Sequence, residues 1–229
     1  MKIGALQKFS MIDYEGKLSA IVFTQGCNFR CPYCHNPELV KPEKYQTPVP
    51  MEIVFSFLEN RIGLLDAVVI TGGEPTLHRD LHVFIKRIKD LGFLVKLDTN
   101  GTNPDVLEHL VKNDLVDYLA MDIKAPLSKY SQVTRCAVDI SKISRSIELI
   151  KTSGVEHEFR STLVKNLLTE DEILDIGNLL GKKTRYFLQN FVPAKTVNEK
   201  FMQAVPLPLE RINILLDKFH LNYSEVYVR

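Results

Sequence analysis

Apolar residues occur along the chain in short, β-rich runs that alternate with segments of helical periodicity. In the segment 81–91, apolar residues recur at the spacing of one helix face, at Leu81, Phe84, Ile85, Ile88 and Leu91. The runs predict strands at residues 20–24, 67–71, 93–98, 118–123, 158–164 and 186–191. The periodic segments predict helices at residues 51–59, 81–91, 104–112, 140–152, 171–180 and 209–219.

Strands that alternate with helices are typical of a parallel sheet with helical crossovers. Six such units are too few for a closed eight-unit barrel. The sequence therefore predicts an α/β fold: a partial (β/α)6 barrel, an open parallel sheet with outer helices, in a single domain over residues 1–229. A doubly wound sheet is the alternative. In both folds, ligands bind at the carboxyl ends of the strands.

Polar and glycine-rich residues follow the predicted strands at this edge. They are Gln25-Gly26-Cys27, Gly72-Gly73-Glu74-Pro75, Asp98-Thr99-Asn100-Gly101, Asp122-Ile123-Lys124, Arg160 and Gln189-Asn190. Because the carboxyl ends of parallel strands meet at one edge, the sequence predicts that these residues form one site.

Composition and charge narrow the class of protein. The 229 residues are 45% hydrophobic and 25% charged, which is ordinary for a globular protein. With 29 basic and 28 acidic residues, the net charge of +1 gives no global attraction to nucleic acid or to an anionic membrane. No segment has signal-peptide character or approaches the roughly 18 apolar residues of a membrane span. We therefore expect a cytoplasmic protein with reduced thiols and with no nucleic-acid or membrane partner.

Three of the four cysteines lie directly after the first predicted strand, in the segment GCNFRCPYCHNP. A dithiol redox site of the glutaredoxin kind would use Cys31 and Cys34, and leaves Cys27 without a role. Such a site also needs a long helix that begins at the first cysteine and lowers its pKa. Pro37 and Pro42 follow too closely for that helix to be favourable.

Two metal sites are the other interpretations of these cysteines. Structural zinc needs four tetrahedral ligands, usually in two separated pairs. His35 adjoins Cys34 and is poorly placed to be the fourth, whereas Cys136 could supply the fourth from a distant part of the chain. A cubane iron–sulfur cluster binds cysteine thiolates, and the spacing Cys-x-x-x-Cys-x-x-Cys lets one loop supply three of them. One iron is then open to a substrate or a cofactor, by analogy with catalytic metal sites.

The same residues resemble the signature of the radical S-adenosylmethionine (SAM) superfamily. The cysteine spacing, Tyr33 before the last cysteine and the Gly-Gly-Glu motif at Glu74 all match it. The resemblance implies that Cys27, Cys31 and Cys34 bind a [4Fe-4S] cluster whose open iron takes the amine and carboxylate of SAM. It further implies that the reduced cluster cleaves SAM to methionine and a 5′-deoxyadenosyl radical.

Within this superfamily the chain is most similar to glycyl-radical-enzyme activases, and among them to anaerobic ribonucleoside-triphosphate reductase activating proteins. The segment LQKFSMIDYEGKLSAIVFTQGCNFRCPYCHNPELV and the motifs TGGEPTL, LDTNGT and MDIKAP carry this resemblance. Glu15 departs from it, because the family has a proline there. Activases abstract a hydrogen from a glycine of a partner enzyme, and the resemblance implies a flavodoxin or ferredoxin as electron donor.

Three alternative functions stay open at this point. The first is activation of a pyruvate formate-lyase-type enzyme. The second is radical chemistry on a small molecule, such as a 7-carboxy-7-deazaguanine synthase-like activity. The third is a zinc-stabilised binding module without catalysis.

The resemblance also implies roles for residues outside the cysteine loop. Tyr33 would lie along the adenine of SAM, and Gly73 and Glu74 would meet the amine of its methionine part. Lys124 and Arg160 would hold the ribose or carboxylate side. The hard chemistry belongs to the cluster and SAM, so no further catalytic residue is predicted.

The resemblance also implies a monovalent cation site, because an activase of this group forms one at the positions that match Asp98, Thr99 and Asp122. Cys136 is interpreted as a bystander thiol. The predicted cofactor-binding residues are Tyr33, Gly72, Gly73, Glu74, Pro75, Asp98, Thr99, Asn100, Asp122, Lys124 and Arg160.

Overall fold

The computed structural model describes residues 1–221, 223 and 225–229. Within these residues, eight strands form one sheet in the order of the chain, from β1 to β8. Strands β1 and β2 are antiparallel, and every later neighbouring pair is parallel. The strands are β1 Ile3–Ser10, β2 Ser19–Thr24, β3 Ala67–Gly72, β4 Leu94–Thr99, β5 Tyr118–Asp122, β6 Glu156–Leu163, β7 Tyr186–Asn190 and β8 Val226–Val228.

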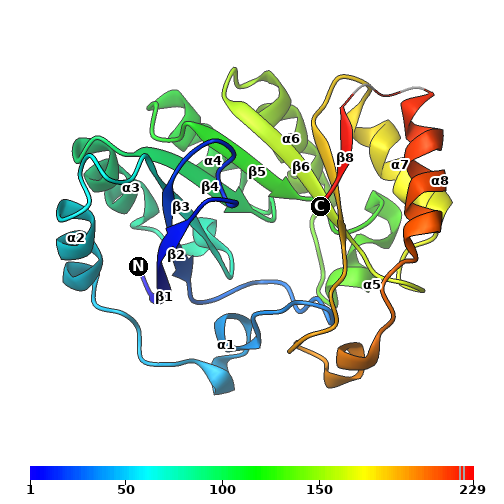
Figure 1. Ribbon diagram of the computed structural model, residues 1–229, viewed down its shortest axis with the longest axis horizontal. Coiled ribbons are helices and arrows are strands. Elements are labelled where there is room, and N and C mark those ends of the chain that lie inside the picture. Colours follow the sequence, from blue (N-terminus) through cyan, green and yellow to red (C-terminus); the bar gives the residue numbers. More distant parts are fainter. Residues whose placement is uncertain (222, 224) are drawn as a thin grey trace.

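The longer helices surround the outer side of the curved sheet, as Figure 1 shows. They are α2 Met51–Glu59, α3 Leu81–Asp90, α4 Pro104–Lys112, α6 Ile140–Thr152, α7 Glu170–Leu180 and α8 Leu209–His220. The short helices are α1 Pro37–Val40 and α5 Tyr130–Thr134, with 3-10 turns at Pro42–Lys44, Pro75–Leu77, Leu127–Lys129 and Glu199–Gln203. The predicted α/β fold with an open parallel sheet and outer helices is confirmed.

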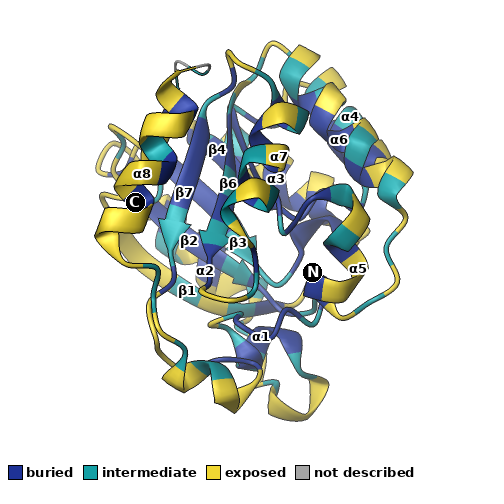
Figure 2. Ribbon diagram, turned by 90° about the vertical axis from the view of Figure 1, so that its right-hand side faces the viewer, coloured by how far each residue is buried: buried dark blue, intermediate teal, exposed yellow. Residues whose placement is uncertain are grey.

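The main hydrophobic core lies between the sheet and the outer helices. Successive side chains of a strand point to opposite faces, so Val68 and Ile70 of β3 pack into this core while Val69 joins a smaller cluster with Tyr118. Figure 2 shows the same division, with buried strands inside and helices whose outer faces are exposed. No helix among the described residues is both long and apolar enough to cross a membrane.

The six predicted strands and six predicted helices are all present, with ends within two residues of the predicted ones. The edge strands β1 and β8 were not predicted. Strand β1 has β2 as its one neighbouring strand in the sheet, so most of its residues are at least partly exposed and it lacks the apolar run of a central strand. Strand β8 has only three residues, which is too short for a periodicity to be recognised.

Candidate functional site

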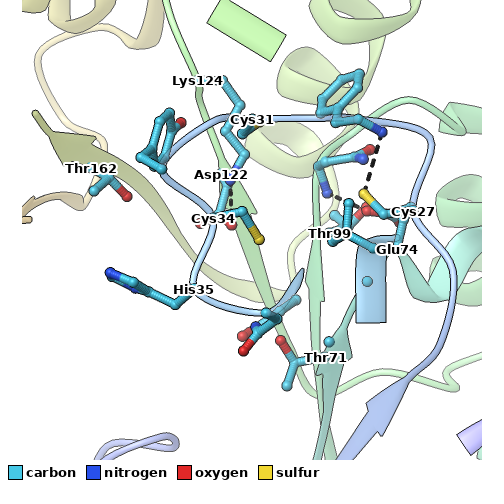
Figure 3. A pocket seen from close by; sticks show the side chains of 18 of the residues that line it. Cys27, Cys31, Cys34, His35, Thr71, Glu74, Thr99, Asp122, Lys124 and Thr162 are labelled. Atoms are coloured by element: carbon cyan, nitrogen blue, oxygen red, sulfur yellow. Dashed lines mark hydrogen bonds and ion pairs between the residues drawn. The ribbon is translucent and has the colours of Figure 1, made fainter. Parts of the chain in front are cut away.

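A cavity of about 1040 Å³, including its open mouth, lies at the carboxyl ends of the parallel strands (Figure 3). The cysteine loop that follows β2 forms one side, and the ends of β3 to β7 form the other. Predicted site residues that line it are Cys27, Cys31, Tyr33, Cys34, Gly72, Gly73, Glu74, Asp98, Thr99, Asn100, Asp122, Lys124 and Arg160. Pro75 is the one predicted cofactor-binding residue that does not line the cavity, because it is buried at the start of a 3-10 turn. Of the other strand-end residues predicted to share the site, Gln189 lines the cavity, whereas Gln25, Gly26, Gly101, Ile123 and Asn190 do not.

The glycine motif holds the end of β3 against the start of the cysteine loop. A Cβ on Gly73 would lie 2.0 Å from the carbonyl oxygen of Gly26, and one on Gly72 would lie 2.5 Å from the backbone nitrogen of Thr24. The backbone N–H of Gly73 donates to Thr24 O at 2.9 Å, and that of Glu74 donates to Gly26 O at 2.7 Å. The absence of a side chain at both glycines therefore lets the backbone that leads to the first cysteine approach the end of β3 closely.

Glu74 organises the ends of two neighbouring strands. Its side chain is 1% exposed, and burial raises its pKa. Oε1 accepts hydrogen bonds from Thr76 N at 3.1 Å and from Thr99 Oγ1 at 2.8 Å. Oε2 accepts one from Asn100 N at 2.6 Å, which leaves this oxygen with remaining acceptor capacity. The carboxylate therefore ties the end of β4 to the end of β3.

Charged side chains form a network across the strands at the cavity wall. Arg160 donates to Asp122 from Nε at 2.8 Å and to Asp98 from Nη1 at 3.2 Å. Lys124 donates to the other oxygen of Asp122 at 3.0 Å. Burial would raise the pKa of Asp122, but Arg160 and Lys124 outweigh it and lower that pKa to about 2. Asp98 Oδ1 is buried, and it has no hydrogen-bond partner among the described residues.

The cysteine loop is held by elements that are distant in the sequence. The N–H of Arg30 donates to the carbonyl of Thr134, at the end of α5, at 2.9 Å. The N–H of Val197 donates to the carbonyl of Cys34, also at 2.9 Å. These bonds fix the loop across the mouth of the sheet, and Figure 3 shows the sulfur atoms of Cys27 and Cys34 turned into the cavity.

Residues 21–180 match a family model described as the radical SAM superfamily. The chain belongs to the radical SAM superfamily. A Methanocaldococcus jannaschii protein named for glycyl-radical enzyme activation is 39% identical over 213 residues, covering 91% of this chain and 87% of that protein. A second protein of the same organism and the same description is 35% identical over 185 residues, covering 78% and 68%.

A solved structure, that of Streptococcus suis SuiB bound to S-adenosylmethionine, shares the fold with a TM-score of 0.66 and 14% identity. The match covers 91% of this chain and 51% of that chain. At this identity the likeness bears on the fold alone. The resemblance to the radical SAM superfamily that the cysteine motif predicted is therefore confirmed, and membership implies a [4Fe-4S] cluster and SAM as cofactors.

The thiols of this radical SAM chain are unsuited to dithiol redox chemistry. Burial raises the pKa of Cys27 to about 12 and that of Cys31 to about 11, and it also raises the pKa of Cys34. A redox-active dithiol needs a lowered pKa instead. Helix α1 begins only at Pro37 and has four residues, so no long helix begins at Cys31.

The donor set of the cavity fits the radical SAM cofactors. Three free cysteines line one wall, as a cubane with one open iron requires. Among the described residues, no three His, Cys, Asp or Glu side chains are grouped to hold a single metal ion. A cubane makes a different demand, because each thiolate binds a different iron. Asp98, Lys124 and Arg160 line the same cavity from the strand ends, where the unpartnered Asp98 Oδ1 and the two cations could bind polar parts of SAM.

Sequence reasoning missed several cavity residues, including Phe29, Thr71 and Thr162. Thr162 could have been found, because it lies two residues after Arg160 on the same strand and so shares its face. His35 lines the cavity and is exposed; its ring stacks on Phe191, and its Nε2 lies 2.9 Å from the carbonyl oxygen of Val192. Cys136 is not among the residues that line the cavity.

Proposed function

We propose that the protein is a radical SAM activase that generates a glycyl radical on a partner enzyme, and that this partner is an anaerobic ribonucleoside-triphosphate reductase. The observation that carries the proposal is one cavity lined by three free cysteines, of which Cys31 is buried and the other two are partly buried, together with the glycine motif and a charged strand-end network. Relatives named for glycyl-radical enzyme activation, similar over most of their length, support the choice of a protein substrate.

In this proposal Cys27, Cys31 and Cys34 hold a [4Fe-4S] cluster. The thiols must lose their protons to bind iron, so cluster assembly releases protons from groups whose pKa is raised by burial. When bound, the reduced cluster would supply the electron for cleavage of the SAM sulfonium, and the resulting 5′-deoxyadenosyl radical would abstract the hydrogen from the partner's glycine. Every other contribution comes from the chain's positioning of these groups.

The strand ends would bind the rest of SAM. Glu74 Oε2 retains acceptor capacity for the ammonium group, beside the first cysteine. Lys124 and Arg160 offer cations to the carboxylate or ribose side, and Asp122 keeps both charged. Tyr33, which is 4% exposed and lines the same cavity, would lie along the adenine.

A monovalent cation is a further part of the proposal. Asp98 Oδ1 supports it, because this buried carboxylate oxygen is unpartnered among the described residues. Its other oxygen and both oxygens of Asp122 already pair with Arg160 or Lys124, so a cation here would share its ligands with Arg160. We also propose a flavodoxin or ferredoxin as electron donor, on the basis of the sequence resemblance alone.

The test is label transfer from the partner. Reconstituted protein is reduced anaerobically with SAM and with a reductase whose glycines carry deuterium at Cα. We expect deuterium in the 5′-deoxyadenosine product and a glycyl radical signal on the reductase, and neither with a reductase whose radical glycine is replaced by alanine. If deuterium came from a pyruvate formate-lyase-type enzyme and not from the reductase, that enzyme would be identified as the partner. SAM cleavage that depends on a small molecule and on neither enzyme would contradict the activase function.

A further inference from the structure

Asn28, the residue after Cys27, belongs to a closed ring of three side-chain hydrogen bonds. Its Oδ1 accepts from Asn100 Nδ2 at 2.8 Å, and its Nδ2 donates to Thr102 Oγ1 at 2.9 Å. Thr102 Oγ1 in turn donates to Asn100 Oδ1 at 2.7 Å. Each side chain donates one bond and accepts one, and hydrogen bonds arranged in this way strengthen one another.

The ring joins the cysteine loop to the turn that follows β4. Asn100 and Thr102 are buried, with 5% and 9% exposure, whereas Asn28 is exposed. Removing the Asn28 side chain would therefore leave the Asn100 amide without its partner at a place with little access to water. An unsatisfied buried donor costs more free energy than a bond between exposed groups contributes.

The ring completes a clamp on the first cysteine. On one side of Cys27, the carbonyl of Gly26 accepts from Glu74 N at 2.7 Å. On the other side, Asn28 bonds to Asn100, whose own N–H donates to Glu74 Oε2 at 2.6 Å. Both neighbours of Cys27 are thus connected to Glu74, while Cys34 is held by a different segment through Val197.

We infer that Asn28 is a positioning residue, which fixes Cys27 relative to Glu74 and thereby the cluster relative to the methionine part of SAM. This inference rests on the proposed function, because Cys27 matters in this way only as a cluster ligand beside the SAM site. It requires no contact between Asn28 and either cofactor. The geometric requirement is strict, since displacement by about 1 Å can cost two orders of magnitude in rate.

Two variants open the ring from opposite sides. Asn28→Ala removes both bonds from the loop side, and Thr102→Val removes the hydroxyl without changing the cysteine loop. Asn113→Ala is the control, because Asn113 is an exposed asparagine whose side chain bonds only within the end of α4. All three thiols remain in every variant, so iron and sulfide contents should match those of the unmodified protein.

The first readout is the electron paramagnetic resonance of the reduced cluster during titration with SAM. We expect the half-saturating SAM concentration to rise about tenfold in Asn28→Ala and in Thr102→Val, because each variant breaks bonds of the ring. The double variant should rise no further than the larger single effect, because both changes open the same ring. Half-saturation as in the unmodified protein, or rises that multiply in the double variant, would overturn the inference.

The second readout uses protein without cluster. Alkylation of Cys27 should be several times faster in both ring variants, while Cys136 serves as an internal reference whose rate stays constant. Unchanged alkylation of Cys27 would also overturn the inference. If the unmodified protein shows no response to SAM, the proposed function fails, and alkylation alone decides whether the ring holds the loop. If Asn28→Ala assembles no cluster, the titration with SAM is performed on Thr102→Val alone.

Discussion

Arg160 and Asp122 are register partners on neighbouring strands, and the guanidinium Nε donates to the carboxylate at 2.8 Å. The pair lies on the cavity wall, with the arginine side chain 12% exposed and the aspartate side chain 30% exposed. Cross-strand pairs of opposite charge stabilise a sheet, and this one also sets the charge state of the groups that face the cavity. The stability and the proposed cofactor site therefore depend on the same contact.

Replacing Arg160 should be destabilising. Arg160→Gln leaves Asp122 with Lys124 alone and leaves Asp98 without its ion pair. Hydrogen bonds to charged groups typically contribute about 1.5–3 kcal/mol, and the partial exposure of this network reduces the expected loss toward the lower value. Urea denaturation measures the free energy of unfolding. Arg145→Gln is the matched control, because Arg145 is half exposed and ion pairs at the surface contribute little to stability. An equal loss of unfolding free energy in the two variants would contradict the structural role of the Arg160 network.

The Asp122 carboxylate should make stability depend on pH in the acid range. Its pKa in the folded protein is about 2, below the usual 3.8, so its contribution is complete above about pH 4 and disappears as the pH falls toward 2. The gap in unfolding free energy between the unmodified protein and Asp122→Asn should shrink over this range. The change should be no more than about 2 kcal/mol, since the carboxylate is partly exposed. A gap that does not change with pH would refute the lowered pKa.

A methyl group on Gly73 should disturb the cysteine loop. Gly73→Ala places a Cβ 2.0 Å from Gly26 O, so the loop backbone must move, and we expect loss of bound iron and sulfide together with lower stability. Gly63→Ala is the control: Gly63 also needs glycine, with φ of +77°, but a Cβ there contacts nothing. It should cost about 1–2 kcal/mol through the backbone alone and leave the cluster content intact. Normal iron content in Gly73→Ala would show that the close approach is unimportant.

The cysteines should separate into two classes. Cys31→Ala should lose the cluster and all reductive cleavage of SAM while the fold remains. Cys136→Ala should retain both, because Cys136 does not line the cavity. Iron analysis and chromatography of the SAM products measure the two properties, and circular dichroism verifies the fold. Full cleavage by Cys31→Ala would remove Cys31 from the ligand set.

Periodicity was sufficient to predict the six inner strands and the helices, because a parallel sheet covered by helices consists of long apolar runs and one-sided stripes. Periodicity did not predict β1 and β8. Strand β1 lies at the edge of the sheet and is mostly exposed, so it has no apolar run, and β8 has only three residues. Strand ends also predicted which residues would surround the cavity, including Asp98, Asp122 and Arg160.

What the sequence could not predict are contacts between side chains of distant segments. The four bonds of the Glu74 carboxylate and the ring of Asn28 depend on rotamers and on the relative placement of three loops. Asn100 illustrates the difficulty. The sequence predicts Asn100 as a cofactor-binding residue, and it lines the cavity, but nothing in the sequence indicated that its side chain also joins the ring that holds the cysteine loop.

The central claim is that the three cysteines hold a cluster with an iron open to SAM. Its most direct test is low-temperature electron paramagnetic resonance of anaerobically reconstituted, reduced protein, recorded with and without SAM. We predict a cubane signal whose shape changes when SAM is added. A protein that binds zinc and shows no cluster signal, or a cluster signal that SAM leaves unchanged, would contradict the claim.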